Sequence, residues 1–284
     1  MGNGKSDQGE NHAATDNEKV IMDMLANYRK EREAFEKLLD CDSYRILLLC
    51  GKSGMGKTTL LRAFEKLLEA KKVCYVSFTF KDMIVLQSIF SLIGDSLEWE
   101  NLTHLSECIS TLSRSQEPIN VTVNSNRLIG MNIKQTLHLV LENKNHAERQ
   151  THWQQLTDSL SKDLRKLSQP LFILLDTYER VNSEIQEWVE SFLKRIRFLP
   201  QLRIVIAGQQ VPDENSIGYG NYTTLLKLEG VTRAEDWVEY MESRKCQSKL
   251  DAMELMKFMC HHYKGHPQEI ASVIESLSMM KELL

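Results

Sequence analysis

The sequence predicts an α/β fold, a parallel sheet flanked by helices, with a helical subdomain at the C-terminus. The first observation is that short apolar runs alternate with helical patterns, which is typical of a parallel sheet covered on both faces. The second is that most of these runs are apolar throughout, as expected for strands buried on both sides. The third is that only helical patterns follow residue 230. The apolar runs lie at 45–50, 73–80, 171–176, 203–208 and 223–230.

The N-terminal part of the chain is first polar and then amphipathic. Residues 1–17 contain almost no bulky apolar side chains, which predicts a disordered tail. Residues 18–40 carry apolar side chains at helical spacing, which predicts a leading helix. The sheet-forming domain is then expected to span 41–230, and a helical lid subdomain is expected to span 231–284.

Within the sheet-forming domain, helical patterns are predicted to connect the strands. These patterns cover 57–71, 82–98, 151–168 and 184–198. Residues 117–141 differ, because they alternate in the manner of strands around turn-forming Asn and Gly. We therefore expect a hairpin insertion at about 117–141.

The bulk composition excludes several classes of protein. The net charge of −4 gives no support for a general nucleic-acid-binding surface. The six cysteines are dispersed without a CxxC pair, which is typical of reduced thiols. No apolar run reaches the roughly 18 residues of a membrane span, so we expect a cytoplasmic protein. The start MGNGKS also matches a myristoylation pattern at Gly2, which is an alternative to a plain disordered tail.

The most specific motif is GKSGMGKT at residues 51–58, which satisfies the pattern GxxxxGK[ST] at every fixed position. An apolar run precedes it and a helical pattern follows it, as this phosphate-binding loop (P-loop) requires. Its glycines let successive backbone N–H groups point at phosphate oxygens, and the following helix N-terminus adds to the attraction. The expected nucleotide-binding residues are Gly51, Lys52, Ser53, Gly54, Met55, Gly56, Lys57, Thr58 and Thr59.

The motif predicts binding of ATP together with Mg²⁺. Lys57 can reach the β- and γ-phosphates, and the Thr58 hydroxyl can be a ligand of the metal. We expect the Lys57 side chain to face solvent and to make no contact with the core.

A second metal ligand is expected from a neighbouring strand. Asp176 ends the apolar run LFILLD, so its carboxylate is predicted to lie at the same edge of the sheet as the P-loop. An Asp at a strand end is also a common turn former. Thr58 and Asp176 are thus the predicted metal ligands.

Hydrolysis needs a further group that orients the attacking water. Glu179 is the nearest carboxylate after Asp176, although a helix-start carboxylate favoured by the helix dipole is the ordinary alternative. Gln209 and Gln210 follow the run RIVIAG, where a polar group could sense the γ-phosphate. The predicted catalytic residues are therefore Lys57, Asp176 and Glu179.

Four segments in this order resemble the STAND class of P-loop ATPases, an AAA-related lineage with NB-ARC and Orc-like domains. They are GKSGMGKTTLL, LFILLDTYE, RIVIAGQ and YKGHPQEI, and the resemblance covers about residues 40–280. The second segment looks like a variant of bacterial members, which implies that Glu179 is the catalytic carboxylate. The last resembles the GxP signature of the lid, which implies that Pro267 contacts adenine while Gly265 permits a close approach. A helix stop followed by a restart would also explain Gly265 and Pro267.

The resemblance also bears on partners. STAND proteins usually continue into a winged helix and a sensor repeat array, and neither is evident in the sequence up to Leu284. We therefore expect self-association or a protein partner to supply sensing and output. An arginine from a neighbouring subunit often completes such sites. Arg195, Arg197 and Arg203 are candidates, although surface charges are the more ordinary interpretation.

Together these patterns favour a signalling or switch ATPase that uses Mg-ATP to change its conformation or assembly. One alternative is a DNA-associated ATPase of the Orc or loader type, which a basic winged helix would favour. The other is a small-molecule kinase, which the long route from the P-loop to Asp176 favours less.

Overall fold

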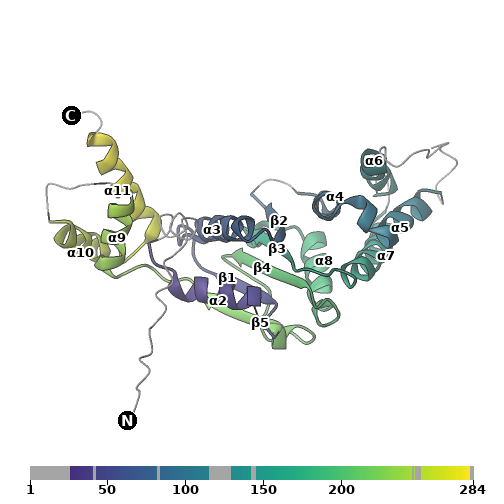
Figure 1. The fold of residues 1–284 in the computed structure, drawn as a ribbon, viewed down its shortest axis with the longest axis horizontal. Helices are drawn as coiled ribbons and strands as arrows, with labels where there is room; N and C mark the ends of the chain where they lie inside the picture. Colours follow the sequence, from purple (N-terminus) through teal and green to yellow (C-terminus); the bar gives the residue numbers. More distant parts are fainter. Residues whose placement is uncertain are drawn as a thin grey trace, which may run out of the picture.

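A computed structural model describes residues 26–40, 43–81, 84–114, 129–141, 145–244, 246 and 251–281 of the chain. The predicted tail and residues 18–25 of the predicted leading helix lie outside this part. Figure 1 shows a central sheet with helices on its faces, a group of helices at one end and the C-terminal helices at the other. No helix within the described ranges is long and apolar enough to cross a membrane.

The sheet is parallel throughout, which confirms the predicted fold class. Its strand order is β2-β3-β4-β1-β5. The strands are β1 (Ile46–Cys50), β2 (Cys74–Thr79), β3 (Leu171–Asp176), β4 (Leu202–Gly208) and β5 (Thr223–Lys227). The strand that ends in Asp176 was expected beside the P-loop strand, but β4 lies between β3 and β1.

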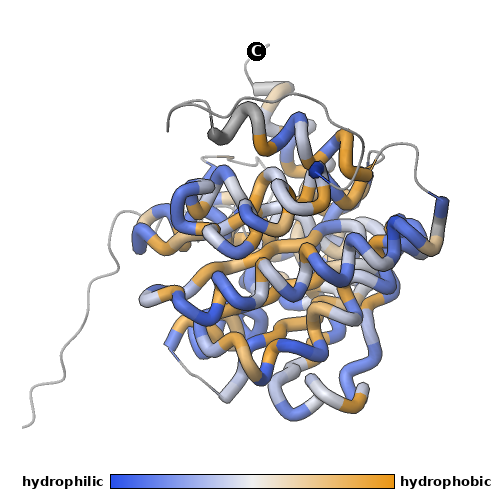
Figure 2. Tube along the Cα trace, turned by 90° about the vertical axis from the view of Figure 1, so that its right-hand side faces the viewer, coloured by the Kyte–Doolittle hydropathy of each residue, from blue (hydrophilic) through white to orange (hydrophobic). Residues whose placement is uncertain are grey.

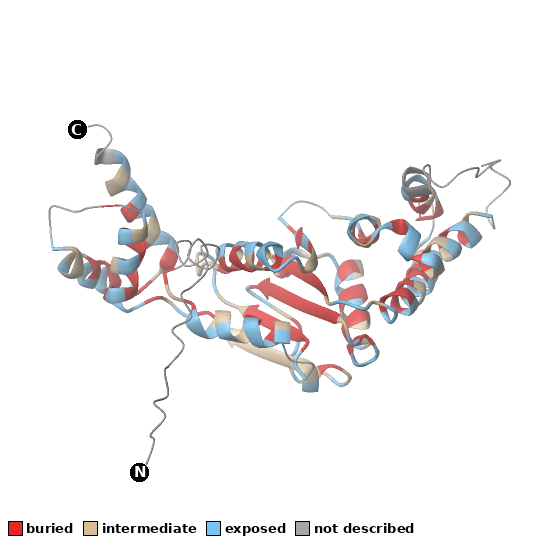
Figure 3. Ribbon diagram, in the orientation of Figure 1, coloured by how far each residue is buried: buried red, intermediate tan, exposed pale blue. Residues whose placement is uncertain are grey.

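Side chains of the central strands point alternately into two hydrophobic cores. In β1, Ile46 and Leu48 join the core on one face, and Leu47 and Leu49 join the core on the other. Figures 2 and 3 show the resulting apolar, buried centre of the molecule. Burial on both faces explains why these strands have no polar alternation in the sequence.

Helices cover both faces of the sheet. The helices that precede β5 are α2 (Arg29–Asp40), α3 (Lys57–Ala70), α4 (Leu86–Leu97), α5 (Thr103–Arg114), α6 (Ile129–Leu141), α7 (His146–Leu164) and α8 (Ser183–Leu193). Short 3₁₀ turns lie at Trp99–Asn101 (η1), Tyr178–Arg180 (η2), Ile196–Phe198 (η3) and Gly220–Tyr222 (η4). On one face, Phe35 of α2 stacks on Phe64 of α3 with ring centroids 3.9 Å apart.

The predicted hairpin at 117–141 is wrong for its second half. Residues 129–141 form α6, while 115–128 lie outside the described residues. Ile133, Leu137, Val140 and Leu141 are buried side chains of α6 that recur at helical spacing, and α6 packs against α4 and α5. The strand-like alternation and the helical spacing overlap in this segment of the sequence, and tertiary packing of the apolar face stabilises the helix.

The predicted leading helix is not continuous over its described part. Helix α2 begins at Arg29, because Asn27 and Tyr28 adopt positive φ angles of 75° and 67°, which no α-helix contains. As shown below, contacts with two other parts of the fold hold these residues.

The C-terminal subdomain consists of α9 (Ala234–Ser243), α10 (Ala252–His262) and α11 (Pro267–Lys281). Gly265 separates α10 from α11 with a φ of 69°, and its carbonyl accepts a hydrogen bond from the Val231 N–H at 2.8 Å. A Cβ on Gly230 would lie 2.8 Å from this same carbonyl oxygen. Gly230 and Gly265 thus allow the two backbone segments to approach closely at the point where the subdomain joins the sheet.

Candidate nucleotide-binding site

The P-loop leaves β1 at Cys50 and enters α3 at Lys57. Gly54 and Gly56 have φ angles of 77° and 74°, which favour glycine. Their neighbours exclude a side chain as well. A Cβ on Gly54 would lie 2.2 Å from Cε1 of His266, and one on Gly56 would lie 2.5 Å from the Tyr28 hydroxyl. Both glycines are therefore required by backbone conformation and by contact.

Lys57 is held inside the loop rather than facing solvent, so that expectation is wrong. The residue is 9% exposed, and Nζ donates hydrogen bonds to the carbonyls of Gly51 at 2.6 Å and Lys52 at 2.8 Å. Burial lowers the pKa of the Lys57 ammonium, while the negative charges of Glu179 and Asp176 oppose this shift. Carbonyl groups of the P-loop backbone thus hold the Lys57 ammonium within the loop.

Thr58 and Asp176 meet as the sequence predicts. The Thr58 hydroxyl donates a hydrogen bond of 2.8 Å to Oδ2 of Asp176, whose side chain is buried. These are hard oxygen donors at one point of the sheet edge, and Mg²⁺ is usually held by one or two such protein oxygens together with phosphates and water. The donor set therefore fits Mg²⁺.

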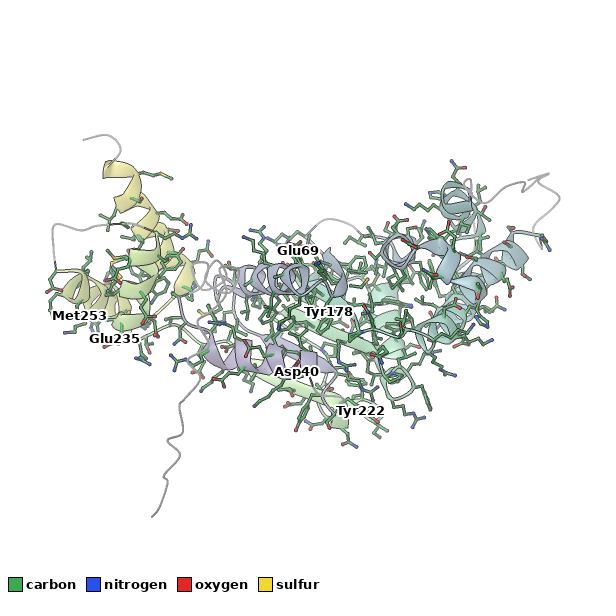
Figure 4. The ribbon with its side chains drawn as sticks, in the orientation of Figure 1. Asp40, Glu69, Tyr178, Tyr222, Glu235 and Met253 are labelled. Carbon is green, nitrogen blue, oxygen red and sulfur yellow. The ribbon has the colours of Figure 1, made fainter. Side chains whose placement is uncertain are left out.

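Glu179 is brought to the same edge by a tight turn. Thr177 adopts a left-handed φ of 61°, and the buried Tyr178 side chain anchors the following turn η2 beside the sheet (Figure 4). The Glu179 carboxylate accepts hydrogen bonds from the backbone N–H of Gln209 at 2.8 Å and from its side-chain amide at 3.3 Å. A Cβ on Gly208 would lie 2.9 Å from this carboxylate, so the glycine leaves room for it.

One cavity of about 630 Å³ joins these groups to the C-terminal subdomain. Most of the predicted site residues line it: Ser53, Gly54, Gly56, Lys57, Thr58, Thr59, Asp176, Glu179 and Pro267. Gly51, Lys52 and Met55 do not line it but supply backbone carbonyls to the hydrogen bonds around the loop. Gln209 lines the cavity, whereas Gln210 is not among its lining residues.

Sequence reasoning missed the part of the cavity lining that comes from residues before α2 and from α9. It includes Ala26, Tyr28, Trp237, Tyr240 and Arg244. The α9 residues recur at spacings of three and four, which marks one helix face, but that pattern alone does not distinguish a pocket from a core. Nothing in the local sequence indicates that Tyr28 reaches the P-loop, because the contact depends on tertiary structure.

Residues 26–28 bridge the P-loop and the C-terminal subdomain. The Tyr28 hydroxyl donates a hydrogen bond of 2.7 Å to the Met55 carbonyl, and the Asn27 amide donates one of 2.6 Å to Asp236 of α9. Burial, together with the charge of Glu31, raises the pKa of the Tyr28 phenol, which keeps it a donor. These two contacts explain the non-helical backbone before α2.

The first turn of α11 also contacts the P-loop directly. The Gln268 N–H donates a hydrogen bond of 3.2 Å to the Gly54 carbonyl, and Pro267 occupies the first helical position. This position favours proline, whose missing N–H would have no partner within the helix. The subdomain is therefore linked to the loop by hydrogen bonding as well as by the packing of His266 on Gly54.

The three arginines that the sequence offers for completing the site of a neighbouring subunit differ in exposure and contacts. Arg203 is 2% exposed and its guanidinium bonds to the carbonyls of Leu38 and Pro200, so it is neither a surface charge nor available to a neighbouring subunit. Arg195 forms an ion pair of 2.8 Å with Asp158. Arg197 is exposed, with its guanidinium 4.4 Å from the ring centroid of Phe198.

Comparisons with known proteins agree with this geometry at the level of the family. No curated protein matched the chain. Among solved structures, the chain is similar to one in the "Structure of E. coli MS115-1 HORMA:CdnC:Trip13 complex", with a TM-score of 0.39 and 12% identity, over 84% of this chain and 70% of that chain. The sequence profile described as "AAA domain" matches residues 40–212, which is more than half of the chain. The chain therefore belongs to the AAA domain family and is an ATP-binding P-loop NTPase.

Proposed function

We propose that the protein is a Mg²⁺-dependent ATPase of STAND type, in which ATP binding and hydrolysis change the position of the C-terminal subdomain. The observation that carries this proposal is that one cavity is lined by the P-loop, by Asp176 and Glu179, and by α11. A nucleotide in this cavity would contact both the sheet-forming domain and the subdomain, so its phosphate content could affect how they pack.

The charges of the cavity support a polyanionic ligand. Its lining includes the cations Lys57, Arg62, Lys81, Arg180 and Arg244 and the carboxylates Asp176, Glu179 and Glu275. The lining thus has an excess of positive charge, although the whole chain carries −4. A magnesium–ATP complex is negatively charged, so the cavity is electrostatically complementary to it.

Two helix N-termini add to this field. α3 begins at Lys57 and α11 begins at Pro267, and the first turns of both line the cavity. The N-terminal end of a helix carries a partial positive charge that favours phosphate. Because α11 belongs to the C-terminal subdomain, the attraction of its N-terminus to phosphate depends on where the subdomain sits.

The contacts of the site indicate what each residue would do. Lys57 would exchange the carbonyls of Gly51 and Lys52 for β- and γ-phosphate oxygens. Thr58 and Asp176 would hold Mg²⁺, which neutralises phosphate charge when bound. Glu179 would leave the Gln209 N–H and orient the attacking water, as a general base requires.

The finer features of the proposal rest on the sequence resemblance. The DTYE segment supports the bacterial STAND type, and the contact of α11 with the P-loop supports a role for Gly265 and Pro267 in coupling. Sensing and output would come from self-association or from a protein partner. Pro267 would contact the adenine, because it lines the cavity together with Trp237 and Tyr240.

Steady-state phosphate release tests the reaction itself. We expect Mg²⁺-dependent hydrolysis of ATP that chelation with EDTA abolishes. Asp176→Asn should reduce it, because the neutral amide removes the negative charge that would hold the metal. Glu179→Gln should slow it by roughly 100-fold or more while ATP binding persists.

Glu36→Gln is the matched control, because Glu36 is an exposed carboxylate on α2. Turnover at the wild-type rate in Glu179→Gln would assign Glu179 to the start of a turn and remove it from catalysis. Transfer of the phosphoryl group to a small acceptor, without phosphate release, would replace the ATPase by a kinase.

A further inference from the structure

A second, smaller cavity lies apart from the nucleotide site, in a groove between α7 and α8. Its volume is about 100 Å³. Its lining residues are Leu86, Gln150, Trp153, Gln154, Thr157, Glu184, Glu187, Trp188 and Ser191. We call this the α7–α8 groove. It is far smaller than the roughly 300–1,000 Å³ of pockets for small molecules and cofactors. It therefore has room only for the terminal group of one side chain.

Two tryptophans form a rigid apolar floor to the groove. Trp153 and Trp188 are each 6% exposed, and Phe90 packs between them with ring centroids 5.7 Å and 5.8 Å away. Phe192 stacks on Trp188 at 5.1 Å. The indole rings are therefore held in fixed positions, and only small parts of them are open to a ligand.

The hydrogen-bond donors of this floor are already used. The indole N–H of Trp153 donates to Glu184 at 2.7 Å, and that of Trp188 donates to the Thr157 hydroxyl at 3.0 Å. Thr157 in turn donates to the Trp153 carbonyl at 2.6 Å. The carboxylates of Glu184 and Glu187 remain as acceptors with negative charge, and the lining contains no Lys, Arg or His to neutralise them.

The chain itself shows which group fits between these two helices. One turn farther along, the Arg195 guanidinium joins Asp158 of α7, at 2.8 Å, to the Ser191 hydroxyl of α8, at 2.6 Å. Four residues earlier on each helix, the corresponding positions are Gln154 and Glu187, and both line the groove. The groove therefore again places one carboxylate between the two helices, here on α8 rather than on α7, and no lining residue supplies a guanidinium to it.

We propose that the α7–α8 groove binds an arginine side chain of a partner protein. A guanidinium carries only donors and a positive charge, which matches the two acceptor carboxylates of a lining that contains no cation. Its planar fork can pair with a carboxylate and lie against an aromatic ring, which a lysine ammonium does less well. Burial of the two tryptophans in the floor also matches the composition of binding hot spots, in which Trp and Arg are enriched.

The four tryptophans of the chain allow a direct test by NMR of their indole N–H groups. The probe is a blocked pentapeptide, Gly-Gly-Arg-Gly-Gly, with citrulline or lysine at the centre as controls. We expect the Trp153 and Trp188 resonances to shift with a Kd of about 1 mM, while those of Trp99 and Trp237 stay in place. Glu187→Gln should weaken binding about fivefold, and Glu36→Gln should leave it unchanged.

The same titration with Lys57→Ala separates this site from the nucleotide site, and binding of the probe should persist there. Equal shifts with the citrulline or lysine peptide would overturn the proposal, as would equal weakening in Glu187→Gln and Glu36→Gln. If the protein self-associates and Glu187→Gln dissociates it, the groove is instead an interface between copies of the chain.

Discussion

Lys57 and Glu179 are both held by backbone groups that they would have to leave when nucleotide binds. Lys57 donates to the carbonyls of Gly51 and Lys52, and Glu179 accepts from the N–H of Gln209. Each contact satisfies a charged group that would otherwise be poorly solvated at the edge of the sheet. Lys57 and Glu179 thus already have partners within the chain, and nucleotide binding would exchange these partners rather than supply the first.

Lys57→Ala should remove nucleotide affinity and leave the fold intact. The truncation removes the charge that meets the phosphates, while the core on both faces of the sheet is unchanged. ATP and Mg²⁺ at 100-fold over Kd should stabilise the wild type by about 2.7 kcal/mol, and the mutant should gain nothing, as measured by thermal unfolding. Lys66→Ala is the control, because Lys66 is an exposed lysine on α3 outside the cavity lining. An equal shift in Lys57→Ala and the wild type would contradict the assignment.

At the scale of elements, α3 and α11 direct their N-termini into one cavity, and His266 packs on the loop between them. The packing requires a glycine at position 54 for a reason separate from its φ of 77°. A side chain at position 54 would therefore destabilise the fold in two ways, through the left-handed backbone and through a clash with the C-terminal subdomain.

A double-mutant cycle separates these two costs. Gly54→Ala should destabilise the fold by more than the roughly 1–2 kcal/mol of a left-handed residue, because its Cβ would lie 2.2 Å from the His266 ring. In the His266→Ala background, Gly54→Ala should lower the free energy of unfolding only by the cost of the left-handed backbone. Urea unfolding of the four variants measures the coupling. Additive effects within about 0.5 kcal/mol would show that His266 does not press on the loop.

The extent to which the sequence predicts these elements depends on how local their causes are. The central strands β1, β3 and β4 are predicted because burial on both faces leaves mainly apolar residues in them. The P-loop is predicted because its glycines and its lysine have fixed spacing. The turn at Tyr28 and the floor of the α7–α8 groove depend on residues far apart in the chain. The start of α6 was misjudged because strand-like alternation and helical spacing coexist there until packing selects one.

Asp176 illustrates the same limit within the candidate site. Its position at the end of a buried strand is a local property, and the sequence predicts it together with the partner Thr58. That β4 lies between β3 and β1 is a property of the whole sheet, which no local pattern specifies. The assignments of Glu179 and Pro267 as catalytic and adenine-contacting residues stay predictions.

At the scale of the whole molecule, the C-terminal helices form one end of an elongated arrangement (Figure 1), and the nucleotide cavity lies where they meet the sheet-forming domain. Hydrogen bonds of Gln268 with Gly54 and of Asn27 with Asp236 cross this junction, and the apolar core on one face of the sheet continues into the C-terminal subdomain. A ligand that favours one arrangement can shift the population only by its difference in affinity for the two. A complete reversal would need about 5.5 kcal/mol, so a partial shift is the realistic expectation.

Small-angle X-ray scattering with sedimentation velocity tests the switch most directly. Wild type and Lys57→Ala would be compared without nucleotide, with Mg-ADP and with a non-hydrolysable ATP analogue and Mg²⁺. The account predicts that the wild-type radius of gyration or assembly state differs between the ADP and ATP-analogue samples, while Lys57→Ala gives one profile in all three conditions. Identical wild-type profiles in all three, at nucleotide concentrations that calorimetry shows to be saturating, would contradict it.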